Sequence, residues 1–226
     1  MRPRKGTSET PGRVLAAACQ VFAEKGYRDA KISEICRCAG ANVAAVNYHF
    51  GDKESLYAEA WRSSFDAALE AHPPDGGVPD DAPPQERLHG RVKALIQRIA
   101  DPHNYEFEIL SKEMGAPTGF LDQAMKEAIE PLRTAMRGIV GELLGGDAPE
   151  LHVGFCARSV ISQCTNLRMR RRLRGSPDPL GPEHIDELAD HVTRFSIAGI
   201  RAVGEWLARA DRPGTEAGMP AGRADG

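Results

Sequence analysis

Apolar residues recur at intervals of three and four along most of the 226-residue chain, which is the period of an amphipathic α-helix. Runs in which β-branched residues alternate with polar ones, the pattern of a half-buried strand, are absent. Glycine, proline and capping residues divide the helical pattern into about nine segments. The sequence therefore predicts an all-α fold, in which a small N-terminal head precedes a larger helical body.

Stop and start signals mark the first four helices. The apolar stripe of the first helix ends at Lys25-Gly26, a C-cap signal. A short second helix ends at Gly40, and Asn42 is placed to cap a third one. Gly51 closes that third helix, and Asp52 caps a longer fourth helix expected to end near residue 72.

Proline and glycine divide the rest of the chain. The stretch from Pro73 to Gln85 is rich in Pro, Gly and Asp, so we expect a loop there. Pro117 fits a helix start, and Pro131 should kink its helix because proline lacks a backbone donor. Residues 175–182 break the pattern, and residues 211–226, without apolar periodicity, are expected to be disordered. Five further helices are expected at about 85–100, 104–115, 118–144, 148–173 and 183–210.

Composition bounds the class of protein. Hydrophobic residues make up 41% of the chain and charged residues 27%, with a net charge of −3, as in ordinary globular proteins. We find neither the apolar core of a signal peptide nor a run long enough to span a membrane, so we expect a cytoplasmic protein without membrane contact. Residues 1–53 carry a net charge of +4 and the remainder −7, which points to an anionic partner at one end.

Cysteine and histidine offer little chemistry. The five cysteines fit no disulfide framework, and Cys156 and Cys164, eight apart on one helical face, are typical of buried thiols. No CxxC or HxxxH pair is present, so we expect neither a metal nor a cofactor. The scattered histidines form no recognisable catalytic motif. An α-helical enzyme is therefore the less favoured of the readings.

Gly40-Ala41-Asn42 separates two short helices, which makes a helix-turn-helix. In its second helix, small residues allow close approach to base edges, where valine and alanine methyls can touch thymine and Asn47 can pair with adenine. Tyr48 and His49 are placed to contact phosphates, and Lys53 adds a cation at the next helix N-terminus. The same pattern also occurs in all-α proteins that never touch DNA, so the residues alone leave both readings open.

The stretch GRVLAAACQVFAEKGYRDAKISEICRCAGANVAAVNYHFGDKESLYAEAW resembles the DNA-binding head of TetR-type transcriptional regulators. The elements F-x-x-x-G-Y, I-x-x-I, A-G and Y-H-F-x-x-K-x-x-L occur in the family's order over about 50 residues. NVAAVNYHFGDKESLY and EILSKEMGAPTGFLDQAMKEAIEPL are similar to the CecR-like subgroup.

The resemblance implies a homodimer that binds a near-palindromic double-stranded DNA operator and is released by a small-molecule effector. It implies a DNA-binding head over residues 1–53 and a ligand-binding and dimerisation body over residues 54–210. Two positions depart from the family, since Lys31 stands where Thr or Ser is common and Ala44-Ala45 replaces Gly-Thr. The expected DNA contacts are Lys31, Asn42, Val43, Ala44, Ala45, Asn47, Tyr48, His49 and Lys53.

The resemblance also implies a ligand cavity and a dimer interface in the body. For each of the cavity candidates, plain core is the more common role of such a residue. The acidic residues Glu106, Glu108 and Glu113 could meet a cationic ligand, although a solvated face is the favoured reading. The cavity candidates are Phe65, Phe107, Met114, Phe120, Met125 and Met136. The interface candidates, on the last two long helices, are Val153, Val160, Leu188, Val192, Phe195, Gly199 and Val203.

Two basic stretches and the regulatory direction stay open. Arg2, Arg4 and Lys5 form either an arm over the DNA or a solvated tail. The arginines from Arg168 to Arg174 are expected to stabilise a helix C-terminus, with a nucleic-acid patch as the alternative. A ligand-responsive repressor is the leading function, with an activator of the same fold as the alternative.

Overall fold

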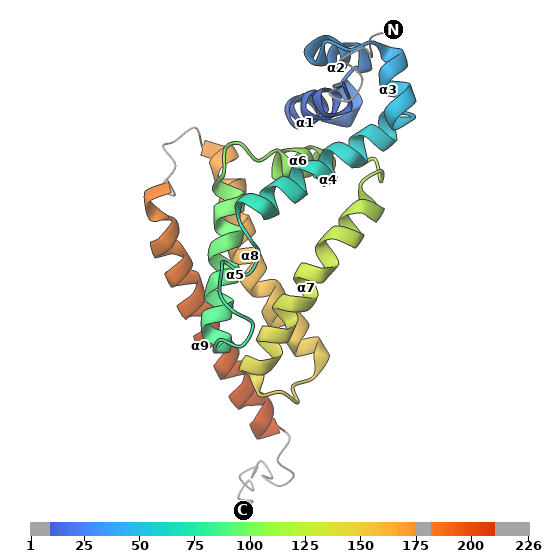
Figure 1. Ribbon diagram of the computed structural model, residues 1–226. Helices are drawn as coiled ribbons and strands as arrows, with labels where there is room; N and C mark the ends of the chain where they lie inside the picture. Colours follow the sequence, from blue (N-terminus) through green and yellow to red (C-terminus); the bar gives the residue numbers. More distant parts are fainter. Residues whose placement is uncertain (1–9, 175–181, 211–226) are drawn as a thin grey trace, which may run out of the picture.

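The computed structural model describes residues 10–174 and 182–210 (Figure 1). Over these residues the chain is all-α, as predicted, and contains nine α-helices and one short 3-10 helix, η1 (Pro182–His184). The α-helices are α1 (Thr10–Asp29), α2 (Ile32–Ala39), α3 (Val43–Phe50), α4 (Lys53–Ala71), α5 (Pro84–Ala100), α6 (Glu106–Gly115), α7 (Asp122–Leu144), α8 (Glu150–Arg174) and α9 (Ile185–Ala210).

The expected stops and caps of the head are confirmed. Gly26 takes φ +74° and interrupts α1, which then adds one short turn to Asp29. Gly40 adopts the left-handed conformation that ends α2. The Ala45 amide donates to Asn42 Oδ1 at 2.8 Å, and the Ser55 amide donates to Asp52 Oδ1 at 2.7 Å. These bonds fix where α3 and α4 begin.

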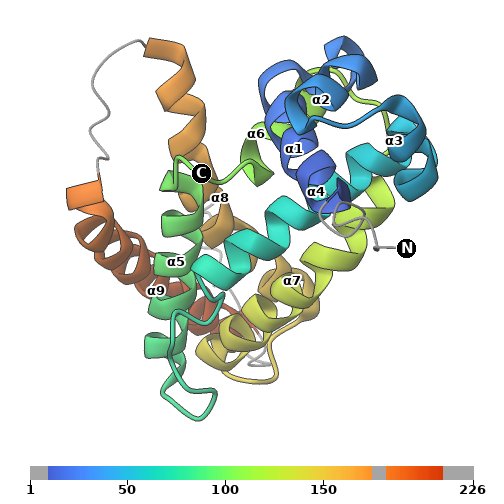
Figure 2. The same ribbon diagram turned by 45° about the horizontal axis from the view of Figure 1, so that its top comes forward.

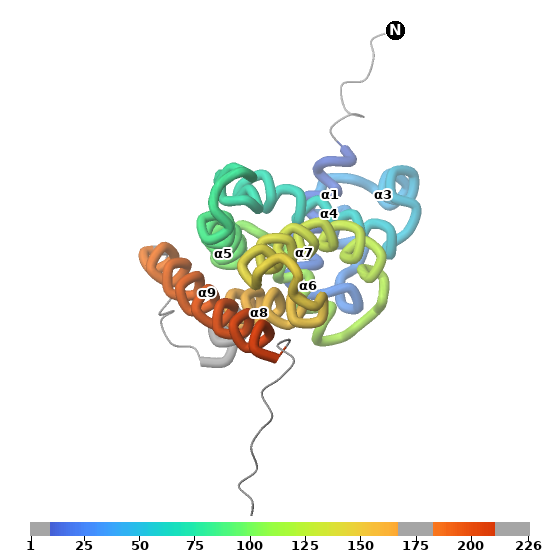
Figure 3. The backbone as a smooth tube through the Cα atoms, turned by 90° about the horizontal axis from the view of Figure 1, so that it is seen from below, coloured from blue at the N-terminus to red at the C-terminus, as the bar shows by residue number. Residues whose placement is uncertain are grey.

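The body is built from α5, α7, α8 and α9, which run alongside one another below the head in Figure 1. Their inward faces share a hydrophobic core that includes Leu88, Val92, Val140, Val160 and Ala189. Figure 3 shows α8 and α9 side by side at one edge of this bundle. The expected loop between α4 and α5 is present, and it covers residues 72–83.

Pro117 does not begin the long helix α7, contrary to the prediction. The helix begins at Asp122 instead of near Thr118, so Pro117 lies in the connection before it. The Glu113 carboxylate accepts hydrogen bonds from the Thr118 and Gly119 amides, which holds this connection in a turn and delays the helix. α7 then continues through Pro131 to Leu144 as one helix.

Head and body share part of one core at their junction. The core cluster of the head continues along α4 as far as Phe65 and takes in Ile109 of α6 and Leu121 of α7. Figure 2 shows α6 lying beside α1 and α4. The division expected at residue 53 therefore falls inside a packed region and not at a flexible linker.

The five cysteines are all free. Cys36 is buried and Cys38 exposed, as their two-residue spacing on a helix requires. Cys164 is fully buried, and burial raises the pKa of its thiol to about 12. None of the helices that the structure describes combines the length and apolar character needed to cross a bilayer.

Candidate nucleic-acid interface

α3 lies on the outside of the head and presents most of its surface to solvent. Among its eight residues Val46 alone is buried, with 0% of its surface exposed. Val43, Ala44 and Asn47 are exposed, and Tyr48 is 84% exposed. Val46 and the half-buried Phe50 pack against the core of the head, and the exposed side chains of α3 are free to meet another molecule.

The exposed side chains of α3 have the chemistry of a helix that reads DNA. Val43, Ala44 and Asn47 form one patch on consecutive turns, and methyl groups beside an amide suit the edges of A·T pairs. Tyr48 and His49 follow at the end of the helix, with their rings 5.0 Å apart. Ala45 is half-buried, so it lies at the edge of this surface.

Asn42 is placed by its role as N-cap. Its Oδ1 is occupied by the Ala45 amide, which leaves its side-chain NH₂ group as the available donor. Lys31 is exposed at the N-cap of α2 and makes no capping bond with its side chain. Lys31 thus puts a cation at an N-cap, a position where Ser, Thr, Asp or Asn is preferred.

Lys53 begins α4 and lies half-buried at the foot of α3. Its Nζ stands 4.3 Å from the centroid of the Tyr27 ring, a cation–π arrangement. Partial burial lowers the pKa of this ammonium. Beside it, hydrogen bonds from the Ser55 backbone and side chain lower the pKa of the capping carboxylate of Asp52.

The chain matches two family descriptions. Residues 14–60 match "Bacterial regulatory proteins, tetR family". Residues 84–200, just over half of the chain, match "HTH-type transcriptional dual regulator CecR, C-terminal domain". The chain belongs to the TetR family of transcriptional regulators, with a C-terminal domain of the CecR type.

Individual relatives agree with this assignment. The dual regulator CecR of Shigella flexneri is 26% identical over 171 residues, which cover 70% of this chain and 74% of that protein. A regulator of Pseudomonas aeruginosa PAO1 has a similar fold, with a TM-score of 0.68 at 18% identity over 90% of this chain and 95% of that one. FadR of Bacillus subtilis, solved in complex with stearoyl-CoA, gives a TM-score of 0.61 at 18% identity, covering 84% of this chain and 98% of that one.

The six cavity candidates of this TetR regulator are spread over several environments. Phe65 and Met136 are buried in different core clusters, and Phe107 and Met125 pack at the edges of those clusters. Met114 is 74% exposed. Phe120 lies at the surface against Tyr27 of the head, with ring centroids 4.8 Å apart. The structure therefore does not bring these six side chains around one space.

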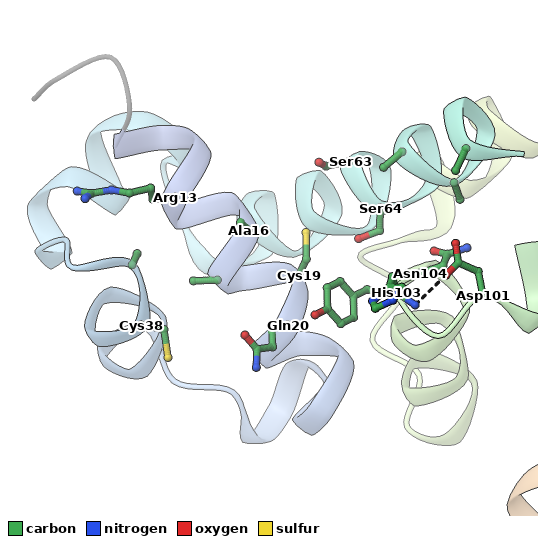
Figure 4. Close-up of a pocket in the computed structure, with 16 residues that line it drawn as sticks. Arg13, Ala16, Cys19, Gln20, Cys38, Ser63, Ser64, Asp101, His103 and Asn104 are labelled. Atoms are coloured by element: carbon green, nitrogen blue, oxygen red, sulfur yellow. Dashed lines mark hydrogen bonds between the residues drawn. The ribbon is translucent and has the colours of Figure 1, made fainter.

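A groove of about 710 Å³ lies instead at the junction of head and body (Figure 4). One side is formed by α1 and α4 and includes Cys19 and Ser64, and the other is the connection from α5 to α6 with His103 and Asn104. The His103 amide donates to Asp101 Oδ1 at 2.8 Å. Alanine residues of α1 and α4 line much of the groove.

Two of the three acidic residues predicted on a solvated face are buried. Arg98 Nη2 donates to both Glu106 oxygens at 2.7 and 2.8 Å, with both side chains almost fully buried. Glu113 accepts from the hydroxyl of Tyr57 at 3.1 Å. These partners are distant in sequence or separated by a loop, so the helical pattern alone gave no signal of them. Over the described residues, His, Cys, Asp and Glu do not gather in threes as a metal site would need.

The interface candidates on α8 and α9 divide into three groups. Val153, Val160 and Val192 are buried in the core of their own chain, and burial removes them from the proposed interface. Leu188 and Val203 pack at the edge of the same core. Phe195, which is 65% exposed, and Gly199 remain on the outer surface.

The outer face also carries large apolar residues that were not predicted from the sequence. Leu151 and Phe155 of α8 and Trp206 of α9 are exposed. His152 joins the two helices, since its ring lies 6.0 Å from that of Phe155 and 5.5 Å from that of Trp206. Phe195, Gly199, the exposed Ala202 and Trp206 recur at helical spacing and mark the outer face. The predicted set combines residues of the inner and outer faces.

Some expected features fall outside the described residues. Arg2, Arg4, Lys5 and residues 211–226 lie there, as do the side chains of Arg168 to Arg174.

Proposed function

We propose that this TetR regulator binds a near-palindromic DNA operator as a homodimer and represses transcription until a small molecule releases it. The observation that carries the proposal is the exposed surface of α3, which is made by Val43, Ala44, Asn47, Tyr48 and His49 while Val46 is buried in the core of the head. A helix exposed in this way can enter a major groove, which is wide enough to accept it.

The contacts we propose fall into two classes. Val43, Ala44 and Asn47 are expected to read base edges, because they lie on the outward surface of α3. Tyr48 and His49 are expected to bind phosphates from the end of that helix. Ala45 and Asn42 flank the first group, and Lys31 and Lys53 supply cations on either side of the helix-turn-helix.

The outer face of α8 and α9 supports a homodimer. Phe155, Phe195 and Trp206 are large and exposed, and aromatic residues are enriched at interfaces. Gly199 lies on the same face and allows close approach of a partner helix. Two copies joined here would each present one α3, as a near-palindrome requires.

We place the effector in the body and leave its identity open. FadR, a protein of similar fold, was solved in complex with stearoyl-CoA. Because FadR is only 18% identical to this chain, the likeness supports a shared fold and does not identify the effector. An activating role is the second candidate, since the Shigella relative is described as a dual regulator. Because the regulator acts on DNA, we also place it in the cytoplasm.

Selection of duplexes from a random-sequence library by the purified protein tests the proposal. We expect enrichment of a near-palindrome whose two halves lie about one helical turn apart or a multiple of it. Transcription in vitro from a promoter carrying that sequence then separates the roles, because a repressor lowers the yield and an activator raises it. Recovery of library sequences without enrichment would contradict specific binding.

A further inference from the structure

Three consecutive residues at the end of α1 contact the segment formed by α6 and its connection to α7. A Cβ placed on Gly26 would lie 3.2 Å from Lys112 Cβ. The Tyr27 ring packs against Phe120 with centroids 4.8 Å apart. Arg28 Nη2 donates to the Pro117 carbonyl at 3.5 Å. The G-Y-R stretch is therefore a docking point between head and body.

Glu113 holds the other side of this contact in shape. Its carboxylate accepts from the Thr118 amide at 2.7 Å, from Thr118 Oγ1 at 2.9 Å and from the Gly119 amide at 3.0 Å. The Phe120 amide in turn donates to Thr118 Oγ1 at 3.2 Å. Because Glu113 is buried, this turn is fixed from the inside and Phe120 projects from it toward the head.

A line of ring contacts runs from this turn to the DNA-binding surface. Phe120 packs on the Tyr27 ring at 4.8 Å, and Tyr27 lies 5.2 Å from Tyr57. Lys53 Nζ lies over the Tyr27 ring, 4.3 Å from its centroid. Phe120, a residue of the body, and Lys53, the proposed phosphate contact, therefore both contact the Tyr27 ring.

We propose that Phe120 is a positioning residue for DNA binding, which fixes the Tyr27 ring under Lys53 and so holds the lysine ammonium ready for a phosphate. The inference rests on the proposed function and assigns Phe120 a role different from the cavity wall expected of it. A lysine side chain has many rotamers, and a ring that restricts them lowers the entropy lost on binding. The turn from Ala116 to Leu121 then acts as a control point, because any movement of it changes the support of Lys53.

The first test needs no DNA. In protein labelled with ¹³C-lysine, the Lys53 ε-methylene protons should be shifted upfield by the Tyr27 ring current. We expect Phe120→Ala to move this signal toward that of an exposed lysine and Phe120→Tyr to preserve it. Met114→Ala, which removes an exposed side chain from the same segment, is the matched control and should leave it unchanged. An unaltered signal in Phe120→Ala would overturn the inference.

The second test is a double-mutant cycle with the duplex enriched from the random library and with a random-sequence duplex. Phe120→Ala should weaken binding of both duplexes roughly fivefold and reduce the salt slope by up to about one ion, as loss of one phosphate contact does. In a Lys53→Ala background it should have no further effect. Phe120→Ala combined with His49→Ala should instead be additive.

The outcomes separate the two claims. Equal losses from Phe120→Ala with and without Lys53, or tighter binding by Phe120→Ala, would overturn the positioning role while the proposed function stands. Failure of the wild-type protein to bind either duplex would overturn both. A thermal unfolding curve of each variant confirms that the protein compared is folded.

Discussion

The hydroxyl of Tyr57 donates to Glu113 Oε2 at 3.1 Å across 56 residues of sequence, and both side chains are buried. Tyr57 lies on α4 in the core of the head, where its ring contacts Phe22 at 4.8 Å. Glu113 lies on α6 and also holds the turn before α7. One carboxylate therefore ties α4, α6 and the start of α7 into a single junction.

Removing either partner should have unequal effects on stability. Tyr57→Phe removes one donor and should lower the free energy of unfolding by about 1 kcal/mol. Glu113→Ala leaves Tyr57 and the Thr118 and Gly119 amides without an acceptor, so its cost should be larger, about 3 kcal/mol. Urea unfolding of the three proteins measures both. Equal losses for the two variants would contradict the central role of Glu113.

The buried pair of Arg98 and Glu106 makes a second stability prediction. Arg98→Met leaves Glu106 charged and buried without its cation, and should cost about 3–5 kcal/mol. Replacing both, as Arg98→Met with Glu106→Leu, removes the stranded charge and should recover much of that loss. Urea unfolding again gives the values. A double variant less stable than Arg98→Met alone would contradict this prediction, because it would show that the ion pair contributes more stability than the burial of its two charges costs.

The local signals in the sequence were enough for the head, but not for its contact with the body. Asn42 and Asp52 were predictable as caps because a cap bonds within three residues of itself. Glu113 was placed on a solvated face, because its burial depends on Tyr57, which is far away in sequence. The delayed start of α7 has the same origin, since Glu113 and not Pro117 decides where that helix begins.

The outward-facing residues of α9 could likewise be predicted only in part from the sequence. Helical periodicity identified α9 as amphipathic, and it did not say which apolar stripe meets the body. Burial places Val192 inside and Phe195 outside, so a single line through both residues combines two faces. Which of the two stripes faces the body depends on how α9 packs on α5, α7 and α8, and the sequence does not show this.

Thiol labelling at pH 8 should separate Cys38 from Cys164. Burial raises the pKa of Cys164 to about 12, so only about one thiol in 10⁴ is ionised at pH 8 and reaction is correspondingly slow. Cys38 is exposed and should react first with a disulfide reagent. Cys38→Ser should remove the fast phase, and Cys164 should label only on unfolding. Mass spectrometry that finds both labelled at the same rate would contradict the burial of Cys164.

The proposed homodimer predicts the effect of a charge on its outer face. Phe195→Asp would bury an unpaired carboxylate between α9 helices, so the dimer should dissociate at least about 100-fold more readily. Met114→Asp, at an exposed residue away from that face, should stay dimeric. Sedimentation velocity over a range of concentrations distinguishes the two. A wild-type monomer, or a Phe195→Asp dimer of unchanged affinity, would contradict the proposed face.

The measurement closest to the central claim compares binding of the enriched duplex with binding of a scrambled duplex of equal length at one fixed salt concentration. Fluorescence anisotropy should show the wild-type protein preferring the enriched duplex at least about 10³-fold. Asn47→Ala should lose at least about tenfold of that preference, while Lys53→Ala should weaken both duplexes alike. Equal affinity of the wild-type protein for the two duplexes would contradict the reading of DNA by α3.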